Sequence, residues 1–235
     1  MNDLYNKYGN KIDELVRACH EITVKGLTSS SGGNLSLRAD CECILITPTG
    51  MPKAEIRPED ICAVDLNGMP LFVPDGLAPT SETPFHTMIM RKRKDIAAVV
   101  HAHPTVLGGY AISKTRWLER PFFPEPAMEI GPIVTVPYAE PSCGKLAEVL
   151  AGYVDRSNGF LLQNHGALAL SPKSVPDAVE RLYMMESVAQ SVFIALRLGD
   201  VRSLTYNEVS DLEALQKVRG LQSDTVPITS AYLFN

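Results

Sequence analysis

The strongest constraint on the fold of this chain is a short apolar run, Ile96–Val100, that ends in the pair His101 and His103. Side chains alternate between the two faces of a β-strand, so residues at i and i+2 point to the same side. A buried strand here therefore delivers two imidazoles to one point just past its end. A third histidine, His165, lies between two other apolar runs, in Gln163-Asn-His-Gly166, and can close the set.

These histidines indicate a metal site. Three neutral imidazoles with an open coordination position are the ligand set of catalytic zinc sites. A His-X-His pair alone is also common at surfaces and in polar core positions, so the third histidine matters to the argument. The carboxylate of Glu82, in Pro79-Thr-Ser-Glu82, can complete the coordination or act as an acid/base. A metal-dependent enzyme is the leading interpretation.

The length and composition of the chain indicate an ordinary globular domain. The 235 residues, 45% apolar and 21% charged, suit a single domain over residues 1–235. A net charge of −5 argues against a nucleic-acid surface. We find neither an apolar run of the ~20 residues that a membrane span needs nor a basic-then-apolar leader. Five cysteines at no framework spacing indicate reduced thiols, so we expect a cytoplasmic protein with no membrane partner.

Periodicity predicts many short strands and a few helices. Helical spacing covers residues 3–25, stopped by Gly26, and residues 174–199; two shorter helices are expected from Thr80 or Ser81 to Lys94 and from Ser142. The basic stretch Arg91–Lys94 is expected to be a solvated face. Strands are expected at residues 34–38, 43–47, 61–66, 69–73, 96–101, 133–137, 160–163 and 167–170.

The order of these elements predicts an α/β sandwich built on one mixed sheet. Residues 119–132 hold four prolines and few periodic signals, so they are expected to form a loop. The tail, residues 203–235, is less regular, and its end, residues 231–235, is expected to be mobile.

Three further segments share one chemistry. They are rich in hydroxyls, glycine or an amide, and none contains Lys or Arg: Ser31-Gly-Gly-Asn34, Thr47-Pro-Thr-Gly50 and Pro79-Thr-Ser81. Glycine lets backbone N–H groups approach a ligand, and a helix N-terminus favours an anion. Together they predict a phosphate pocket beside the metal, whereas each alone is an ordinary turn or cap. A Walker loop or GxGxxG is absent, so a nucleotide fold has no support.

At this point the motifs resemble a known family. Over residues 5–200 the chain is similar to the class II aldolase/adducin family, and most to its L-fuculose phosphate aldolase branch. The similarity rests on Gly33-Asn-Leu-Ser-Leu-Arg38, Ile46-Thr-Pro-Thr-Gly50, Pro79-Thr-Ser-Glu82, Val100-His-Ala-His103 and Asn164-His-Gly166, in the family's order and spacing. The resemblance implies a three-layer α/β/α sandwich around a mostly antiparallel sheet, assembled as a homotetramer with active sites at subunit interfaces.

The resemblance also assigns roles to residues. It implies Zn²⁺, or another divalent ion, held by His101, His103 and His165, with Glu82 as the catalytic acid/base. It implies a phosphate pocket formed by Ser31, Gly32, Asn34, Thr49, Gly50, Thr80 and Ser81. The implied reaction is cleavage of a ketose 1-phosphate to dihydroxyacetone phosphate and an aldehyde through a metal-stabilised enediolate.

One departure leaves the reaction open. The aldolase branch uses a tyrosine, in the loop that here spans residues 120–128, for proton transfer at the aldehyde oxygen, and this loop has none. Acidic and phenolic groups could stand in for that tyrosine, and a second family tyrosine in the tail has two unaligned counterparts. These candidates are Glu125, Glu129 and Tyr138 near the loop, and Tyr206 and Tyr232 in the tail.

Aldol cleavage is therefore the first hypothesis, and other reactions on the same scaffold follow it. The proline-rich loop also resembles the branch that decarboxylates a phosphorylated 3-oxo sugar acid. A pentulose phosphate 4-epimerase fits less well, because that branch carries Asp at the position of Glu82. A dehydratase of a methylthio-pentulose phosphate is a further alternative. A non-catalytic, adducin-like assembly module would be favoured by loss of the three histidines, and all three are present.

Overall fold

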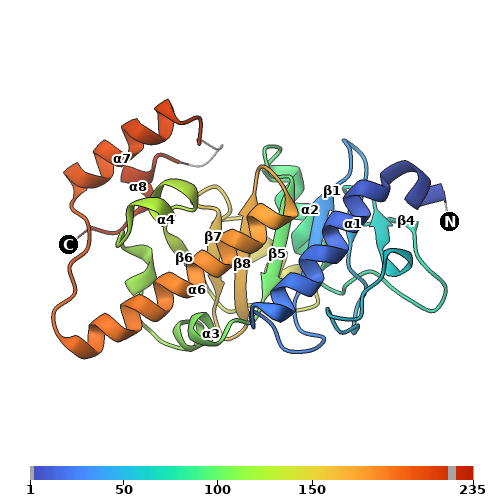
Figure 1. Ribbon diagram of the computed structural model, residues 1–235, viewed down its shortest axis with the longest axis horizontal. Coiled ribbons are helices and arrows are strands. Elements are labelled where there is room, and N and C mark those ends of the chain that lie inside the picture. The colour runs from blue at the N-terminus through green and yellow to red at the C-terminus, as the bar shows by residue number, and fades with distance from the viewer. Residues whose placement is uncertain (1–2, 222–225, 235) are drawn as a thin grey trace.

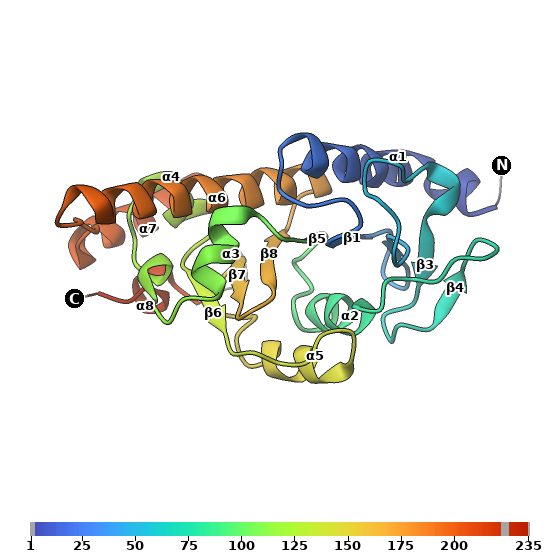
Figure 2. The same ribbon diagram turned by 90° about the horizontal axis from the view of Figure 1, so that it is seen from below.

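The computed structural model describes residues 3–221 and 226–234, and its core is an eight-stranded sheet with helices on both faces. Figure 2 shows three layers: α1 and α6 above the sheet, the strands in the middle, and α2 and α5 below. The chain begins and ends at opposite ends of the long axis (Figure 1). The predicted α/β/α sandwich is confirmed.

The sheet order is β4-β3-β2-β1-β5-β8-β7-β6, and only the β6–β7 pair is parallel among the described strands. Each predicted strand is present with slightly different ends. The strands are β1 (Asn34–Arg38), β2 (Ile44–Ile46), β3 (Cys62–Val64), β4 (Pro70–Phe72), β5 (Ala98–Ala102), β6 (Ile133–Val136), β7 (Gly159–Leu162) and β8 (Gly166–Ser171). The turn that joins β3 to β4 contains Gly68, with φ +85°.

The helices cover the sheet. They are α1 (Asp3–Val24), α2 (Thr83–Lys92), α3 (Thr105–Ala111), α4 (Pro124–Glu129), α5 (Gly144–Leu150), α6 (Val175–Leu198), α7 (Tyr206–Val218) and α8 (Ile228–Ala231), with 3-10 turns η1 (Pro58–Asp60) and η2 (Trp117–Glu119). The Ser174 side chain caps α6 by accepting from the backbone N–H of Asp177 at 3.2 Å, as the sequence predicts.

The central strand β5 separates two apolar cores. Ala98, Val100 and Ala102 face the core beneath α1 and α6, whereas Val99 faces the core against α2 and α5. This alternation follows the two-residue period of a strand. It turns His101, two residues after Val99, toward the α2 side. The site is therefore built at the end of β5 by the strand that is most deeply embedded in the sheet.

Residues 119–132 are not a loop throughout, and this expectation was wrong. They contain the end of η2 and the helix α4, whose first residue is Pro124 and third is Pro126. Backbone N–H groups in the first turn of a helix have no intrahelical acceptor, so proline is tolerated there. Two of the four prolines that suggested a loop therefore lie in the first turn of a helix.

Helix N-termini also differ from expectation. The N-cap of α2 is Glu82 rather than Thr80 or Ser81, and the N-cap of α5 is Cys143 rather than Ser142. Ser142 instead adopts a left-handed backbone, with φ +59°. Thr80, Ser81 and Ser142 therefore lie just before the helices that they were expected to cap.

The basic stretch at the end of α2 is not simply a solvated face, as expected. The Arg93 side chain is 1% exposed. Its guanidinium donates to Asp95 Oδ2 at 2.6 Å, to the carbonyl of Val154 at 3.0 Å and to Asn158 Oδ1 at 2.9 Å. A buried charge must be paired in this way to be tolerated. Arg93 thereby fastens the end of α2 to the segment that follows α5.

The tail forms two helices, α7 and α8. Val209, Ile228 and Tyr232 bury their side chains together with Ala127 of α4. The tail thus packs on the proline-rich segment, as Figure 1 also shows. The predicted mobility of residues 231–235 falls partly outside the described residues, because Asn235 is not described. Among the described helices, none has the length and apolar character required to cross a membrane.

Candidate active site

Three neighbouring strands bring the histidines together. Asn34 of β1 pairs with His101 of β5, and His101 pairs with Leu168 of β8. His165 lies in the three-residue turn from β7 to β8, where Asn164 takes a left-handed φ of +56°. Asparagine tolerates this conformation better than most residues. The turn projects His165 toward the strand end that carries the other two imidazoles.

The three imidazoles converge as the sequence predicted. His101 Nε2 and His103 Nε2 are 3.0 Å apart, and the ring centroids of His101 and His165 are 4.7 Å apart. One ring nitrogen from each of the three lies within 4.8 Å of the others. Gly166 makes this packing possible, because a Cβ there would overlap the ring of His103 and lie 2.7 Å from the carbonyl oxygen of Ala102.

The donor set fits a metal ion. His101 Nδ1 donates to the carbonyl of Ala167 at 3.0 Å, so the lone pair on Nε2 faces the group. Burial and then the neighbouring imidazoles keep the pKa of His101 well below its ordinary value, so its ring is neutral. Within the described residues, His165 Nδ1 and Glu82 Oε1 are buried without a hydrogen-bond partner. A cation among them satisfies neutral lone pairs and a carboxylate together.

Glu82 closes this group from the α2 side. Its side chain is 8% exposed, with Oε2 3.4 Å from His101 Nε2 and Oε1 3.5 Å from His165 Nε2. Asn34 Nδ2 donates to Oε2 at 2.8 Å. The carboxylate is therefore fixed through one oxygen, and the other oxygen faces the imidazoles. This is the placement expected of a residue that either ligates an ion or moves a proton beside it.

A polar pocket of about 260 Å³ opens beside Glu82 and His165. Six of the seven residues predicted to bind phosphate line it: Ser31, Asn34, Thr49, Gly50, Thr80 and Ser81. A bridge between Pro48 and Pro79 brings two of their three segments together. Gly32 is the exception, since it lies beside His103 and its neighbour Gly33 lines the pocket.

Ser142 also lines this pocket, although its position in the sequence predicts only a helix cap. The Ser81 hydroxyl donates to the Ser142 hydroxyl at 2.9 Å. Serine is a common N-cap residue, so only the three-dimensional structure shows that Ser142 also lies in the pocket. The pocket thus contains hydroxyls, an amide and backbone N–H groups, and no Lys or Arg among its lining residues.

A positive charge nevertheless lies behind the pocket. Lys53 is 1% exposed, and its ammonium donates to the carbonyls of Ser31 at 3.1 Å and Met51 at 2.7 Å. Its backbone N–H also donates to the carbonyl of Ser30 at 3.1 Å. Burial lowers the pKa of Lys53 from its ordinary value. The sequence analysis missed this residue, because nothing in the local pattern marks a lysine as buried.

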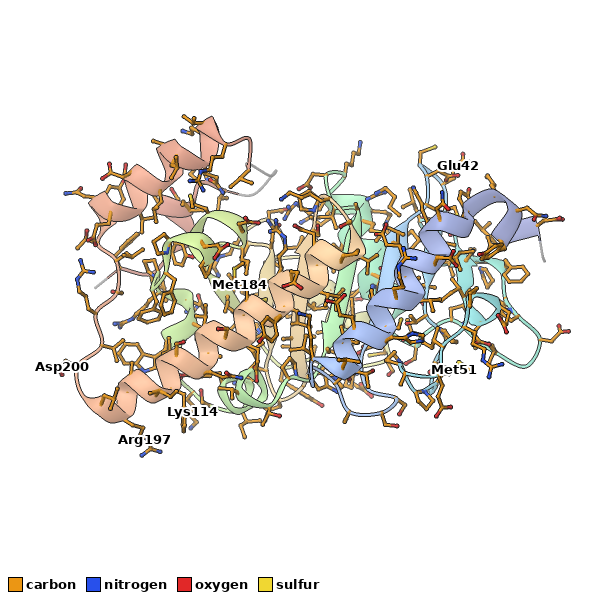
Figure 3. The ribbon with its side chains drawn as sticks, viewed as in Figure 1. Glu42, Met51, Lys114, Met184, Arg197 and Asp200 are labelled. Atoms are coloured by element: carbon orange, nitrogen blue, oxygen red, sulfur yellow. The ribbon has the colours of Figure 1, made fainter. Side chains whose placement is uncertain are left out.

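We expect Lys53→Met to weaken binding of a phosphorylated substrate by about 10-fold or more, because two loop carbonyls lose a charged donor worth roughly 1.5–3 kcal/mol. Lys114→Met is the matched control, since Lys114 is exposed and far from Met51 in Figure 3. Isothermal titration with inorganic phosphate measures the difference. Equal affinity in both variants would show that the ammonium does not support the pocket.

The candidate replacements for the family tyrosine do not line this pocket in the described part of the chain. Glu129 pairs with Arg181 at 3.4 Å, and Tyr232 is buried beneath α7. Glu125 and Tyr138 are exposed, and the ring of Tyr206 contacts that of Phe234. Their predicted roles stay predictions.

A second, apolar cavity of about 420 Å³ lies between α3 and α6. Tyr110, Trp117 and Phe193 line it, and none of the predicted site residues does. The titratable and hydrogen-bonding groups that chemistry needs are gathered in the smaller pocket instead. That pocket and the histidine group are therefore the candidate active site.

Comparison with known proteins agrees with this geometry. Residues 13–193 match the family described as Class II Aldolase and Adducin N-terminal domain. This match spans most of the chain, and so the chain belongs to the class II aldolase and adducin family.

Relatives in this family include two kinds of enzyme. A 3-oxo-tetronate 4-phosphate decarboxylase of Pectobacterium atrosepticum is 33% identical over 204 residues, which cover 85% of this chain and 90% of the relative. An L-fuculose phosphate aldolase of Methanococcus maripaludis is 33% identical over 184 residues, covering 78% and 96%. The solved structure of YgbL from Klebsiella pneumoniae, an aldolase/epimerase/decarboxylase candidate, superposes with a TM-score of 0.80 at 30% identity, covering 87% and 98%.

Proposed function

We propose that the protein is a metal-dependent lyase that decarboxylates a phosphorylated 3-oxo sugar acid. The observation that carries the proposal is the contact of three groups at one point: the histidines, the Glu82 carboxylate and the polar pocket. The absence of tyrosine from residues 120–128 favours decarboxylation over aldol cleavage. Loss of CO₂ requires no proton transfer at the departing group, whereas aldol cleavage must remove a proton from the hydroxyl that becomes the aldehyde oxygen. The similarity to the Pectobacterium decarboxylase supports the same choice.

In this proposal His101, His103 and His165 hold a divalent ion, and Zn²⁺ suits three imidazoles best. When bound, such an ion supplies Lewis acidity to a carbonyl oxygen on which negative charge develops. The neutral ring of His101, held by Ala167, is oriented before any ion arrives. Orientation by a second hydrogen bond is what keeps a ligand in place during turnover.

The pocket and Glu82 act on the substrate itself. Ser31, Thr49, Thr80 and Ser81 bind the phosphate, which places the 3-oxo group beside Glu82. The bond from the carboxylate carbon to its neighbour breaks, its electron pair passes toward the 3-oxo group, and CO₂ departs. Glu82 then delivers one proton to the carbon that lost the carboxylate. A 3-oxo-tetronate 4-phosphate would yield dihydroxyacetone phosphate in this way.

Aldol cleavage of a ketose 1-phosphate is the second candidate. The similarity to the Methanococcus L-fuculose phosphate aldolase favours it. Both reactions break a carbon–carbon bond next to a carbonyl, leave its electron pair on the phosphate-bearing fragment, and need the same proton from Glu82. They differ in the group that leaves and in the hydroxyl proton that only aldol cleavage must remove. Epimerisation and dehydration fit the same ligand set, but no residue of the pocket favours them specifically.

One experiment separates the two candidates. Zinc-loaded protein is given 3-oxo-tetronate 4-phosphate, and CO₂ and dihydroxyacetone phosphate are measured against an incubation without protein. We expect EDTA-sensitive release of both products in equal amounts. A parallel sample in D₂O follows exchange of a hydroxymethyl proton of dihydroxyacetone phosphate by NMR. Exchange with no decarboxylation would replace this proposal with aldol cleavage, and neither reaction would overturn both.

We also propose that the protein assembles as a homotetramer with the site at a subunit interface. Large apolar side chains on α3, α6 and the segments that follow them are exposed, which supports association with further copies: Ile112 at 70%, Phe193 at 50%, Ile194 at 57% and Leu198 at 83%. Light scattering coupled to size exclusion measures the mass, and a monomer at micromolar concentration would contradict the proposal.

A further inference from the structure

A row of buried hydrogen bonds runs behind Glu82, away from the pocket. Glu82 Oε2 accepts from Asn34 Nδ2 at 2.8 Å. On the other side of the same amide, Asn34 Oδ1 lies 2.6 Å from His86 Nε2. His86 Nδ1 in turn lies 2.7 Å from the hydroxyl of Ser36. Neither His86 nor Ser36 lines the pocket or belongs to the histidine metal group.

Two elements form this row through their regular periods. Asn34 and Ser36 are at i and i+2 of β1, so both point toward the α2 layer. Glu82 and His86 are at i and i+4, one turn apart at the start of α2. Two side chains from the strand thus alternate with two from the helix. Secondary structure alone fixes the spacing of all four groups.

Burying these polar side chains costs desolvation free energy, so we expect the row of hydrogen bonds to have a function. Ser36 and His86 are both 0% exposed, among the side chains of an otherwise apolar core. Phe85 stacks on the His86 ring with centroids 4.5 Å apart and excludes water from it. Burial lowers the pKa of His86 to about 3, so the ring is neutral and carries one N–H. An apolar pair of similar size would fill this space without the desolvation cost.

The hydrogen bond at the Glu82 end sets the direction of the other hydrogen bonds in the row. The Asn34 amide donates through Nδ2 to Glu82 Oε2, so its oxygen faces His86 Nε2. That oxygen requires a donor, so the proton of His86 is on Nε2. The lone pair on Nδ1 then accepts from the Ser36 hydroxyl. In all three hydrogen bonds the donor lies on the Ser36 side and the acceptor on the Glu82 side. Reversing any one of them would leave two donors or two acceptors facing each other.

We propose that Ser36 and His86 are positioning residues that lock the Asn34 amide in the orientation that holds Glu82. The inference rests on the proposed role of Glu82 in proton transfer. Fixed through Oε2, the carboxylate keeps Oε1 toward His165 and the pocket. Without the lock the amide can turn by 180° and present its oxygen to Glu82, which repels the carboxylate from its reactive position.

Two variants at His86 test the lock. His86→Leu removes the donor to Asn34 and is expected to lower kcat by about 10–100-fold, as loss of an orienting partner does. KM should change far less than kcat, and metal content should stay at the wild-type level, because the variant removes neither a pocket hydroxyl nor one of the three histidines. His86→Gln keeps an N–H₂ for Asn34 and should recover part of kcat. If both variants have a lower kcat, a higher KM and a lower metal content, His86 has only a structural role and the proposal is wrong.

Coupling to Glu82 sharpens the test. Because His86 acts through Glu82, adding His86→Leu to Glu82→Gln should cost no further activity. Multiplicative losses would contradict the proposal. If His86→Leu does not fold, Ser36→Ala replaces it, with a smaller loss of kcat expected, since it removes one oxygen and leaves the Nε2 proton in place. Unchanged kcat in Ser36→Ala would then overturn the role of Ser36.

A measurement without turnover separates this inference from the proposed reaction. In ¹⁵N-histidine-labelled, metal-free protein, NMR distinguishes the protonated ring nitrogen from the one with a lone pair. We expect His86 to be the Nε2–H tautomer, with a protected proton that is lost in Asn34→Ala. A Nδ1–H tautomer would overturn the lock even in an active enzyme. An inactive wild-type protein with the expected tautomer would overturn the reaction and leave the lock intact.

Discussion

Purified His103→Ala protein is expected to lose its metal ion and keep its fold. His103 lies just after β5, and its ring contacts the rings of His101 and His165 rather than an apolar core. Removing the ring therefore deletes one of the three proposed ligands and buries no new polar group. We expect zinc to fall from about one ion per chain to below about a tenth, since ligand loss leaves an incomplete coordination set.

The measurement is metal content by mass spectrometry after dialysis, together with thermal melting. A bound ion stabilises the native state, so the melting temperature of the variant must be compared with that of metal-free wild-type protein. His20→Ala is the matched control, because His20 is exposed and its ring lies 2.9 Å from the carbonyl of Ile56, outside the histidine group. Full zinc occupancy in the His103 variant would remove this residue from the proposed ligand set.

The convergence of the histidines could be predicted because it follows from local rules. Strand alternation fixes His101 and His103 on one side, and a short turn between two apolar runs fixes His165. These rules need no knowledge of distant contacts. The polar pocket was predicted for a similar reason, since hydroxyls and glycine in three turns have few other uses than capping or binding.

The residues behind the site could not be predicted in the same way. Lys53 and Arg93 are charged, and charged residues are expected at the surface. Only the tertiary structure brings the backbone carbonyls that accept their hydrogen bonds. The His86 ring looks like any histidine on a helix until α2 is laid against β1. The helix α4 is hidden in the sequence because a cluster of prolines indicates a loop, whereas proline is tolerated in the first turn of a helix.

The Glu82→Gln variant is expected to keep its metal and its substrate affinity and to lose turnover. Glutamine preserves size and can still accept from Asn34 Nδ2 through its oxygen, so the start of α2 is undisturbed. Its amide nitrogen then occupies the position of Oε1 beside His165 and cannot carry a proton to carbon. We expect kcat to fall by about 10²–10⁴-fold, the range that a positioned acid/base contributes.

The exchange of dihydroxyacetone phosphate protons in D₂O isolates this step from the departure of CO₂ or an aldehyde. It should disappear in Glu82→Gln while zinc remains bound, whereas Glu55→Gln, an exposed carboxylate changed in the same way, should exchange at the wild-type rate. Loss of zinc together with exchange would make Glu82 a ligand first and leave its proton-transfer role without support. Normal exchange with zinc bound would assign the proton to another group, and the row of hydrogen bonds behind Glu82 would then lose its catalytic purpose.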